Sequence, residues 1–130
     1  MDYFRALVVD DEQDFLETLV NRLGKRSIDT SGVKSGEEAI EKARTGRYDL
    51  ITLDLIMPEM SGLDALDAIK KVQPQVPVMI ITGNATDKLI REAGVLGACR
   101  VLYKPVLLED FVNELTARLV GPDRKGDTVG

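Results

Sequence analysis

The sequence contains no histidine, no tryptophan and a single cysteine. Without histidine, an imidazole general base, a Ser-His triad and nearly every kind of zinc site are excluded. The one cysteine, Cys99, has no partner for an intrachain disulfide or a multi-cysteine metal site, and its apolar neighbours indicate a small residue of the core. Any chemistry must therefore use carboxylates, hydroxyls, lysine and a hard metal ion.

Long apolar runs and basic clusters are missing as well. No segment approaches the roughly 20 apolar residues that span a bilayer, and the N-terminus has no apolar signal region. The formal net charge of -5 disfavours contact with a phosphate backbone. No G-x-x-x-x-G-K-[ST] nucleotide-binding loop occurs either. We therefore expect a cytoplasmic protein with no direct nucleic-acid binding and no membrane contact.

The length and composition fit one domain. With 130 residues and 44% hydrophobic composition, the chain can bury one core and is too short for two ordinary domains. We expect this domain to cover residues 1–120. Residues 121–130 have no apolar period and are interpreted as a disordered tail or linker.

Apolar stretches without polar alternation predict strands that are buried on both faces, as in a parallel sheet covered by helices. These strands are expected at residues 6–9, 50–53, 77–81 and 101–103, with a weaker strand at 27–33. Apolar residues at helical spacing follow each strand. Gly24 can take the left-handed conformation that closes the first helix, and Ser35 and Glu38 match a capping box for the second. Further helices are expected at residues 61–71, 86–94 and 108–119.

The strict alternation of strand and helix predicts an α/β fold. Short connections and right-handed crossovers favour a flavodoxin-like, doubly wound (βα)5 domain whose parallel sheet has the strand order 2-1-3-4-5. In this order the first and third strands lie side by side. The carboxyl ends of the strands then meet at one edge of the sheet, which is where ligands bind in such folds.

Polar residues follow four of the predicted strands. Asp10 and Asp11 follow the first strand, Asp54 the third, Thr82 the fourth and Lys104 the fifth. Each also has a purely structural interpretation, because Asp can cap a helix or hold a turn, and a strand-end Thr or Lys can belong to a solvated turn. Their joint placement at one edge of the sheet favours a shared site.

Three clustered carboxylates either hold a proton or bind a cation. Oxygen ligands favour a hard divalent ion. With few protein oxygens, water to complete an octahedron and a phosphate ligand, Mg²⁺ fits better than Ca²⁺, and no EF-hand pattern occurs. With the cluster neutralised, Asp54 can attack a phosphoryl group and form an acyl phosphate. Lys104 would offer a positive charge to one phosphoryl oxygen, and Thr82 would offer a hydroxyl to another.

These residues resemble the pattern of the receiver domain of bacterial two-component response regulators, over nearly all of residues 4–120. The resemblance implies that Asp54 takes a phosphoryl group from the phosphohistidine of a sensor histidine kinase or a phosphotransfer protein. It implies that Asp11, Asp54 and the backbone carbonyl of Ile56 bind Mg²⁺ directly and that Asp10 acts through water. It also implies a signalling module, monomeric or weakly dimeric, that catalyses only its own phosphoryl transfer and dephosphorylation.

Two positions depart from the family pattern. Val101 stands where the family usually has Tyr or Phe, and Val106 stands where an aromatic residue often follows Lys-Pro. The resemblance implies output through the surface of the fourth helix, fifth strand and fifth helix. Tyr103 would project from the same strand face as Val101. It is either a substitute for the missing aromatic switch or an aromatic residue that only packs.

Two other functions fit parts of the pattern. A phosphatase or phosphotransferase of the haloacid-dehalogenase type also uses an Asp nucleophile, Mg²⁺ and a lysine, but it has D-x-D after its first strand and a cap insertion. This chain has the adjacent pair Asp10-Asp11 and no such insertion. A receiver used only as an unphosphorylated interaction module is the second alternative. The retention of all three acids argues against it, because clustered carboxylates destabilise a fold that does not use them.

Overall fold

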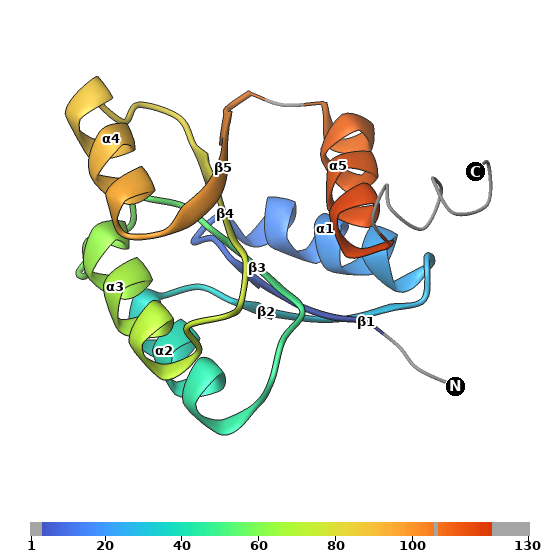
Figure 1. Ribbon diagram of the computed structural model, residues 1–130. Helices are drawn as coiled ribbons and strands as arrows, with labels where there is room; N and C mark the ends of the chain where they lie inside the picture. The colour runs from blue at the N-terminus through green and yellow to red at the C-terminus, as the bar shows by residue number, and fades with distance from the viewer. Residues whose placement is uncertain (1–3, 106, 121–130) are drawn as a thin grey trace, which may run out of the picture.

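The computed structural model describes residues 4–105 and 107–120. Within them, strands and helices alternate along the chain (Figure 1). The elements are β1 (Phe4–Val9), α1 (Gln13–Gly24), β2 (Ile28–Val33), α2 (Gly36–Thr45), β3 (Leu50–Leu53), α3 (Gly62–Val72), β4 (Val78–Thr82), α4 (Asp87–Val95), β5 (Ala98–Tyr103) and α5 (Leu108–Val120). Val106 and the tail predicted for residues 121–130 lie outside the described residues.

The strands form one parallel sheet with the order β2-β1-β3-β4-β5. The predicted doubly wound fold and strand order are thereby confirmed. Helices α1 and α5 cover one face of the sheet, and α2, α3 and α4 cover the other (Figure 1). No helix of the described residues combines the length and the apolar character needed to cross a membrane.

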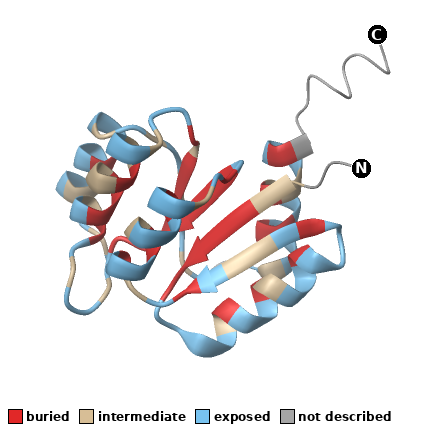
Figure 2. Ribbon diagram, turned by 90° about the horizontal axis from the view of Figure 1, so that it is seen from below, coloured by how far each residue is buried: buried red, intermediate tan, exposed pale blue. Residues whose placement is uncertain are grey.

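The central strands are buried on both faces because helices cover each side (Figure 2). Side chains alternate along a strand, so Leu7, Ile51 and Ile80 join the core beneath α2, α3 and α4. Their neighbours Val8 and Ile81 join a second core beneath α1 and α5. The carboxyl edge of the sheet is therefore held rigidly by packing from two directions.

Side-chain caps fix the starts of three helices. Ser35 Oγ accepts the Glu38 N–H of α2 at 3.2 Å, while the Glu38 carboxylate accepts from the Lys34 N–H, one residue earlier than in the usual capping box. Ser61 Oγ accepts the Leu63 N–H of α3, and Thr86 Oγ1 accepts the Leu89 N–H of α4. The helix starts predicted from these residues are confirmed.

Helix α1 ends at Gly24 as predicted, but Gly24 does not take the left-handed conformation expected of it. Gly24 is the last residue of the helix, but the left-handed residue of the turn is Ser27, with a φ of 64°. The backbone continues through tight turns, in which Arg26 N–H donates to Leu23 O and Ser27 N–H to Gly24 O. The reversal into β2 therefore falls three residues later than the glycine suggests.

The core assignment of Cys99 is also wrong, because this side chain is exposed. Val78 pairs with Ala98 and Met79 pairs with Arg100, so Cys99 is the extra residue of a β-bulge. β5 is also an edge strand, and its residues are at most half-buried. Apolar neighbours do not imply burial at such a position.

Two buried hydroxyls have no hydrogen-bond partner among the described residues, and one of them, that of Thr52, lies within the core. Thr52, in the middle of β3, is fully buried, and its Oγ1 makes no hydrogen bond. Burying an unpaired hydroxyl costs about 1–3 kcal/mol. This position therefore lowers the stability of the fold.

We predict that Thr52→Val raises the free energy of unfolding by about 1 kcal/mol, because valine has nearly the same shape and no group to desolvate. Urea unfolding measures the change. Thr30→Val on β2 is the matched control, since Thr30 Oγ1 donates to Ile28 O at 3.0 Å and the variant loses that bond. A less stable Thr52→Val would show that Oγ1 has a partner such as a buried water.

Candidate functional site

Three predicted site residues meet where β1, β3 and β5 end. Lys104 Nζ donates to Asp10 Oδ2 and to Asp54 Oδ2, each at 3.0 Å. Asp10 is fully buried and Asp54 is 4% exposed, whereas Lys104 reaches them from the rim. The strand order explains this convergence, because β1 and β3 are adjacent and β5 lies two strands beyond β3.

The second oxygen of each buried carboxylate holds the loop that follows its strand. Asp10 Oδ1 accepts the Glu12 N–H at 2.9 Å, and Asp54 Oδ1 accepts the Ile56 N–H at 3.0 Å. These are the turn-holding bonds of the structural interpretation. The structural and functional interpretations are compatible, since each carboxylate uses one oxygen for its turn and one for Lys104.

Asp11 completes an acidic cluster. Its side chain is exposed, and carboxylate oxygens of Asp10, Asp11 and Asp54 all lie within 4.8 Å of one another. Such a set of hard oxygen donors fits a divalent cation of the magnesium or calcium type. The chemistry of these residues therefore fits a divalent metal ion, without distinguishing magnesium from calcium.

Burial and charge act in opposite directions on the ionisable groups. Burial raises the pKa of Asp10, and hydrogen bonds from the Glu12 N–H and from Lys104 offset only part of that increase. Burial lowers the pKa of Lys104, but its hydrogen bonds to Glu12, Asp10 and Asp54 outweigh burial and raise that pKa above its usual range. Lys104 is therefore a fixed cation at the centre of the acids.

Thr82 ends β4, between β3 and β5. Its side chain is fully buried, and its Oγ1 makes no hydrogen bond within the described residues. The Thr82 carbonyl oxygen accepts the Lys104 N–H at 2.7 Å, which ties the ends of β4 and β5 together. The hydroxyl is thus a buried donor without an acceptor at the end of β4.

Three residues near the site are not identified by the sequence analysis. Glu12 Oε1 lies 2.7 Å from Lys104 Nζ, and the Phe15 ring centroid lies 5.4 Å from the same atom. Nothing in the sequence separates Glu12 from an ordinary solvated acid or Phe15 from an ordinary core residue.

Gly62 is the third. A Cβ there would lie 2.3 Å from Leu55 Cα, so only glycine lets α3 begin against the loop after Asp54. Gly62 N–H also donates to Leu55 O at 3.0 Å. No sequence signal identifies this close approach, because Gly36 also follows a capping serine and faces side-chain atoms rather than backbone.

A cavity of about 470 Å³ opens beside Lys104. It is lined by Glu12, Phe15, Gly83, Asn84, Lys104 and Pro105.

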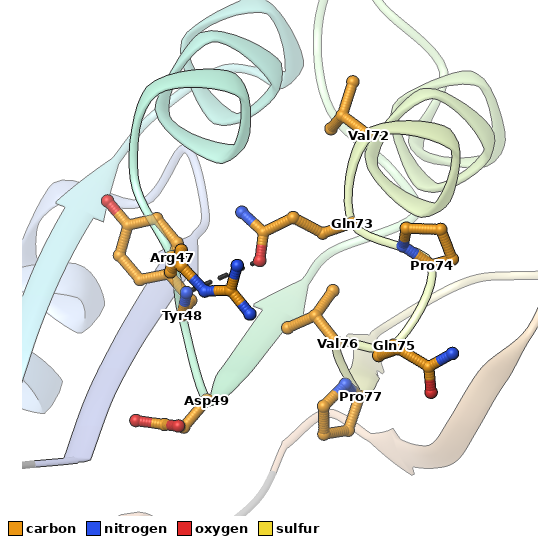
Figure 3. Close-up of a pocket in the computed structure, with 9 residues that line it drawn as sticks. All are labelled: Arg47, Tyr48, Asp49, Val72, Gln73, Pro74, Gln75, Val76 and Pro77. Atoms are coloured by element: carbon orange, nitrogen blue, oxygen red, sulfur yellow. Dashed lines mark hydrogen bonds between the residues drawn. The ribbon is translucent and has the colours of Figure 1, made fainter.

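Another cavity, of about 280 Å³, lies next to the start of β3, at the opposite edge of the sheet (Figure 3). There the Gln73 side chain accepts a hydrogen bond from the Tyr48 N–H (Figure 3). It also donates to Ala43 O and Gly46 O, each at 2.6 Å. These hydrogen bonds connect the end of α3 with the end of α2 and with the loop between α2 and β3.

A doubly wound sheet with adjacent acids after its first strand, and with an acidic cluster and a lysine at its carboxyl edge, is the arrangement expected of a receiver domain. The chain belongs to the response regulator receiver domain family, whose model matches residues 6–116. It is 30% identical to the response regulator receiver protein CpdR of Brucella abortus over 89% of this chain and 97% of that protein. It is 31% identical to the chemotaxis protein CheY of Thermotoga maritima over 78% of this chain and 85% of that protein.

The chain spans less of other relatives. It covers 43% of the receiver protein Anae109_2439 of Anaeromyxobacter, with 33% identity over 78% of this chain. Among solved structures, a CheY-like receiver domain from Methanospirillum hungatei matches with a TM-score of 0.88 at 22% identity, covering 95% of this chain and 99% of that chain. A Burkholderia pseudomallei response regulator with a phosphorylated aspartic acid and a calcium ion matches with a TM-score of 0.79 at 26% identity, covering 96% and 72%.

We predict that Asp10→Asn stabilises the fold at pH 7 in the absence of divalent metal. Burial raises the pKa of Asp10 above 3.8 in the folded state, so the charged form costs stability at neutral pH. That cost disappears as the pH falls through the raised pKa, and the advantage of the variant should shrink with it. Urea unfolding between about pH 4 and pH 8 measures both effects.

Asp14→Asn is the control, since it removes the same charge at an exposed position of α1. It should change stability little at any pH. An Asp10→Asn advantage that stays constant over this pH range would contradict the stated cause.

Proposed function

We propose that this chain accepts a phosphoryl group on Asp54 from the phosphohistidine of a sensor histidine kinase or a phosphotransfer protein. Receiver domains of response regulators are phosphorylated on aspartate in two-component signalling. The observation that supports Asp54 most strongly is its position. Its carboxylate belongs to the acidic cluster at the end of β3, with Oδ2 3.0 Å from Lys104 Nζ.

In the proposed step, an Asp54 carboxylate oxygen forms the new bond to phosphorus. The bond between phosphorus and the donor's histidine nitrogen breaks, and that nitrogen keeps the electron pair. Lys104 stabilises a phosphoryl oxygen because its ammonium already lies beside Asp54 Oδ2. Thr82 gives its unpaired hydroxyl to another oxygen, which would relieve the cost of burying that group.

Asp10, Asp11 and Asp54 would hold Mg²⁺, and the resemblance adds the backbone carbonyl of Ile56. When bound, the ion neutralises the acids and makes the approach of an anionic phosphoryl group favourable. The protein's own part is to hold the carboxylates in place, which the Glu12 and Ile56 N–H groups do. Calcium in the phosphorylated relative is consistent with a divalent ion at such a site.

We propose a signalling module rather than an enzyme with a separate substrate. Its only catalysis would be its own phosphorylation and dephosphorylation. Family membership sets aside the haloacid-dehalogenase alternative, and the acids around Lys104 favour a working phosphoacceptor over an unphosphorylated module. We assign residues 1–120 to the receiver domain and residues 121–130 to a tail or linker, in a cytoplasmic protein that is monomeric or weakly dimeric.

We further propose that the surface of α4, β5 and α5 carries the output to a partner protein or domain. Val101 is half-buried and aliphatic, so it offers no polar switch. Val101 pairs with Ile80 and Tyr103 with Thr82, which puts both side chains on one face of β5. The Tyr103 side chain is 57% exposed. An exposed ring beside Thr82 supports the substitute role more than the packing role.

Asp54→Asn should abolish phosphorylation by a small phosphodonor, because the amide is a poor nucleophile. Mass spectrometry of the intact protein measures the added phosphoryl group. Asp11→Ala should keep the nucleophile but make phosphorylation slow and insensitive to Mg²⁺. Asp14→Asn serves as control, since it lies outside the cluster. Phosphorylation of Asp54→Asn at the wild-type rate would refute the assignment.

For the output surface, we predict that beryllium fluoride with Mg²⁺ moves the Tyr103 ring to a more buried position. The Thr82 hydroxyl would move toward the bound group and leave space on its face of the sheet, which the Tyr103 ring on the adjacent strand would fill. NMR of the Tyr103 ring, with Tyr48 as an internal control at the opposite edge of the sheet, measures the change. A Tyr103 ring with the same rotamer and exposure in both states would leave the switch role without support.

A further inference from the structure

The ammonium of Lys104 has three N–H donors, and three carboxylates take them. Asp10 Oδ2 and Asp54 Oδ2 lie 3.0 Å from Nζ, and Glu12 Oε1 is closer, at 2.7 Å. Both aspartates are buried, whereas the Glu12 side chain is 62% exposed. Glu12 is therefore the partner of Lys104 that faces solvent.

The Glu12 side chain is not required for the start of α1. Glu12 occupies the N-cap position, but its side chain makes no capping hydrogen bond. Its backbone N–H binds Asp10, and its carboxylate binds Lys104. A substitution that keeps the backbone therefore leaves the loop bond to Asp10 in place and changes only the contact with the lysine.

The Glu12 carboxylate stands at the approach to the site. It lines the cavity of about 470 Å³ together with Lys104, and the Phe15 ring lies under the ammonium at 5.4 Å. A phosphoryl group that enters through this cavity meets a negative charge before it reaches Lys104. The Glu12 carboxylate and the phosphoryl group carry charges of the same sign, so they repel each other.

We propose that Glu12 is a positioning residue. Its carboxylate accepts a hydrogen bond from Lys104 before phosphorylation, and a phosphoryl oxygen replaces it as the acceptor. The inference rests on the proposed function of Asp54. With all three donors taken, a new acceptor requires that one carboxylate leaves. Glu12 leaves at the lowest cost because water can replace the ammonium around an exposed carboxylate, whereas the buried aspartates are shielded from water.

A consequence is that Glu12 sets the affinity of the site for small anionic phosphodonors. With acetyl phosphate, an Asp54 oxygen forms the new bond to phosphorus, and the phosphorus–oxygen bond to acetate breaks. Acetate leaves with the electron pair, so no oxidant or reductant takes part. Glu12 opposes the approach of this donor through its charge and through its hold on Lys104.

Glu12→Gln tests this, because it keeps the size of the side chain and removes its charge. The half-saturating concentration of acetyl phosphate should fall by about two- to fivefold, as expected for an exposed ion pair. The maximal rate should stay unchanged. Phosphoramidate, which carries less negative charge at neutral pH, should show a smaller effect. Added salt should reduce the difference from wild type.

Glu17→Gln is the matched control, since it removes the same charge from an exposed position further along α1. Glu12→Asp keeps the charge and should preserve both the wild-type preference between donors and its salt dependence. An unchanged or increased half-saturating concentration in Glu12→Gln would overturn the inference, as would an equal effect of Glu17→Gln.

The residue that is phosphorylated in the wild type distinguishes a failure of the proposed function of Asp54 from a failure of the role of Glu12. Peptide mapping that finds the phosphoryl group on a residue other than Asp54 would overturn the proposed function, and this inference with it. If every variant is phosphorylated on Asp54 with the same half-saturating concentration, only the role of Glu12 is refuted.

Discussion

The repulsion between carboxylates at the carboxyl edge of the sheet is the constraint on which this structure depends. Asp10 and Asp54 are buried close together, and burial alone raises the cost of their charges. Lys104 offsets that cost by donating to both carboxylates. The ion pairs connect the ends of β1, β3 and β5, so the site and the topology of the sheet are coupled.

The sheet makes this arrangement possible because its central strands cannot shift. β3 and β4 are buried on both faces, and a change of register would move every side chain from one core to the other. The loop after Asp54 is fixed from the other side by α3, which approaches so closely at Gly62 that a side chain does not fit. Rigid packing thus keeps the carboxylates of Asp10, Asp11 and Asp54 close together against their mutual repulsion.

The side of the site formed by α1 and α5 is held by a different set of contacts. The rings of Phe15 and Phe111 stack with centroids 5.9 Å apart. Arg22 and Arg26 both pair with Glu109 on α5. Phe15 also lies under the Lys104 ammonium, so the packing of α1 on α5 supports the residue that neutralises the acids.

The sequence by itself determined the strand order and the helix starts at Ser35, Ser61 and Thr86, because apolar periodicity and capping are local signals. It also determined that Asp10, Asp54 and Lys104 meet, because the carboxyl ends of the strands converge in this topology. It did not determine the exposure of Cys99, which depends on a bulge in an edge strand. Nor did it determine the contact between Glu12 and Lys104, which are 92 residues apart. Only the tertiary structure decided these features, because burial and ion pairing depend on which distant residues share the same space.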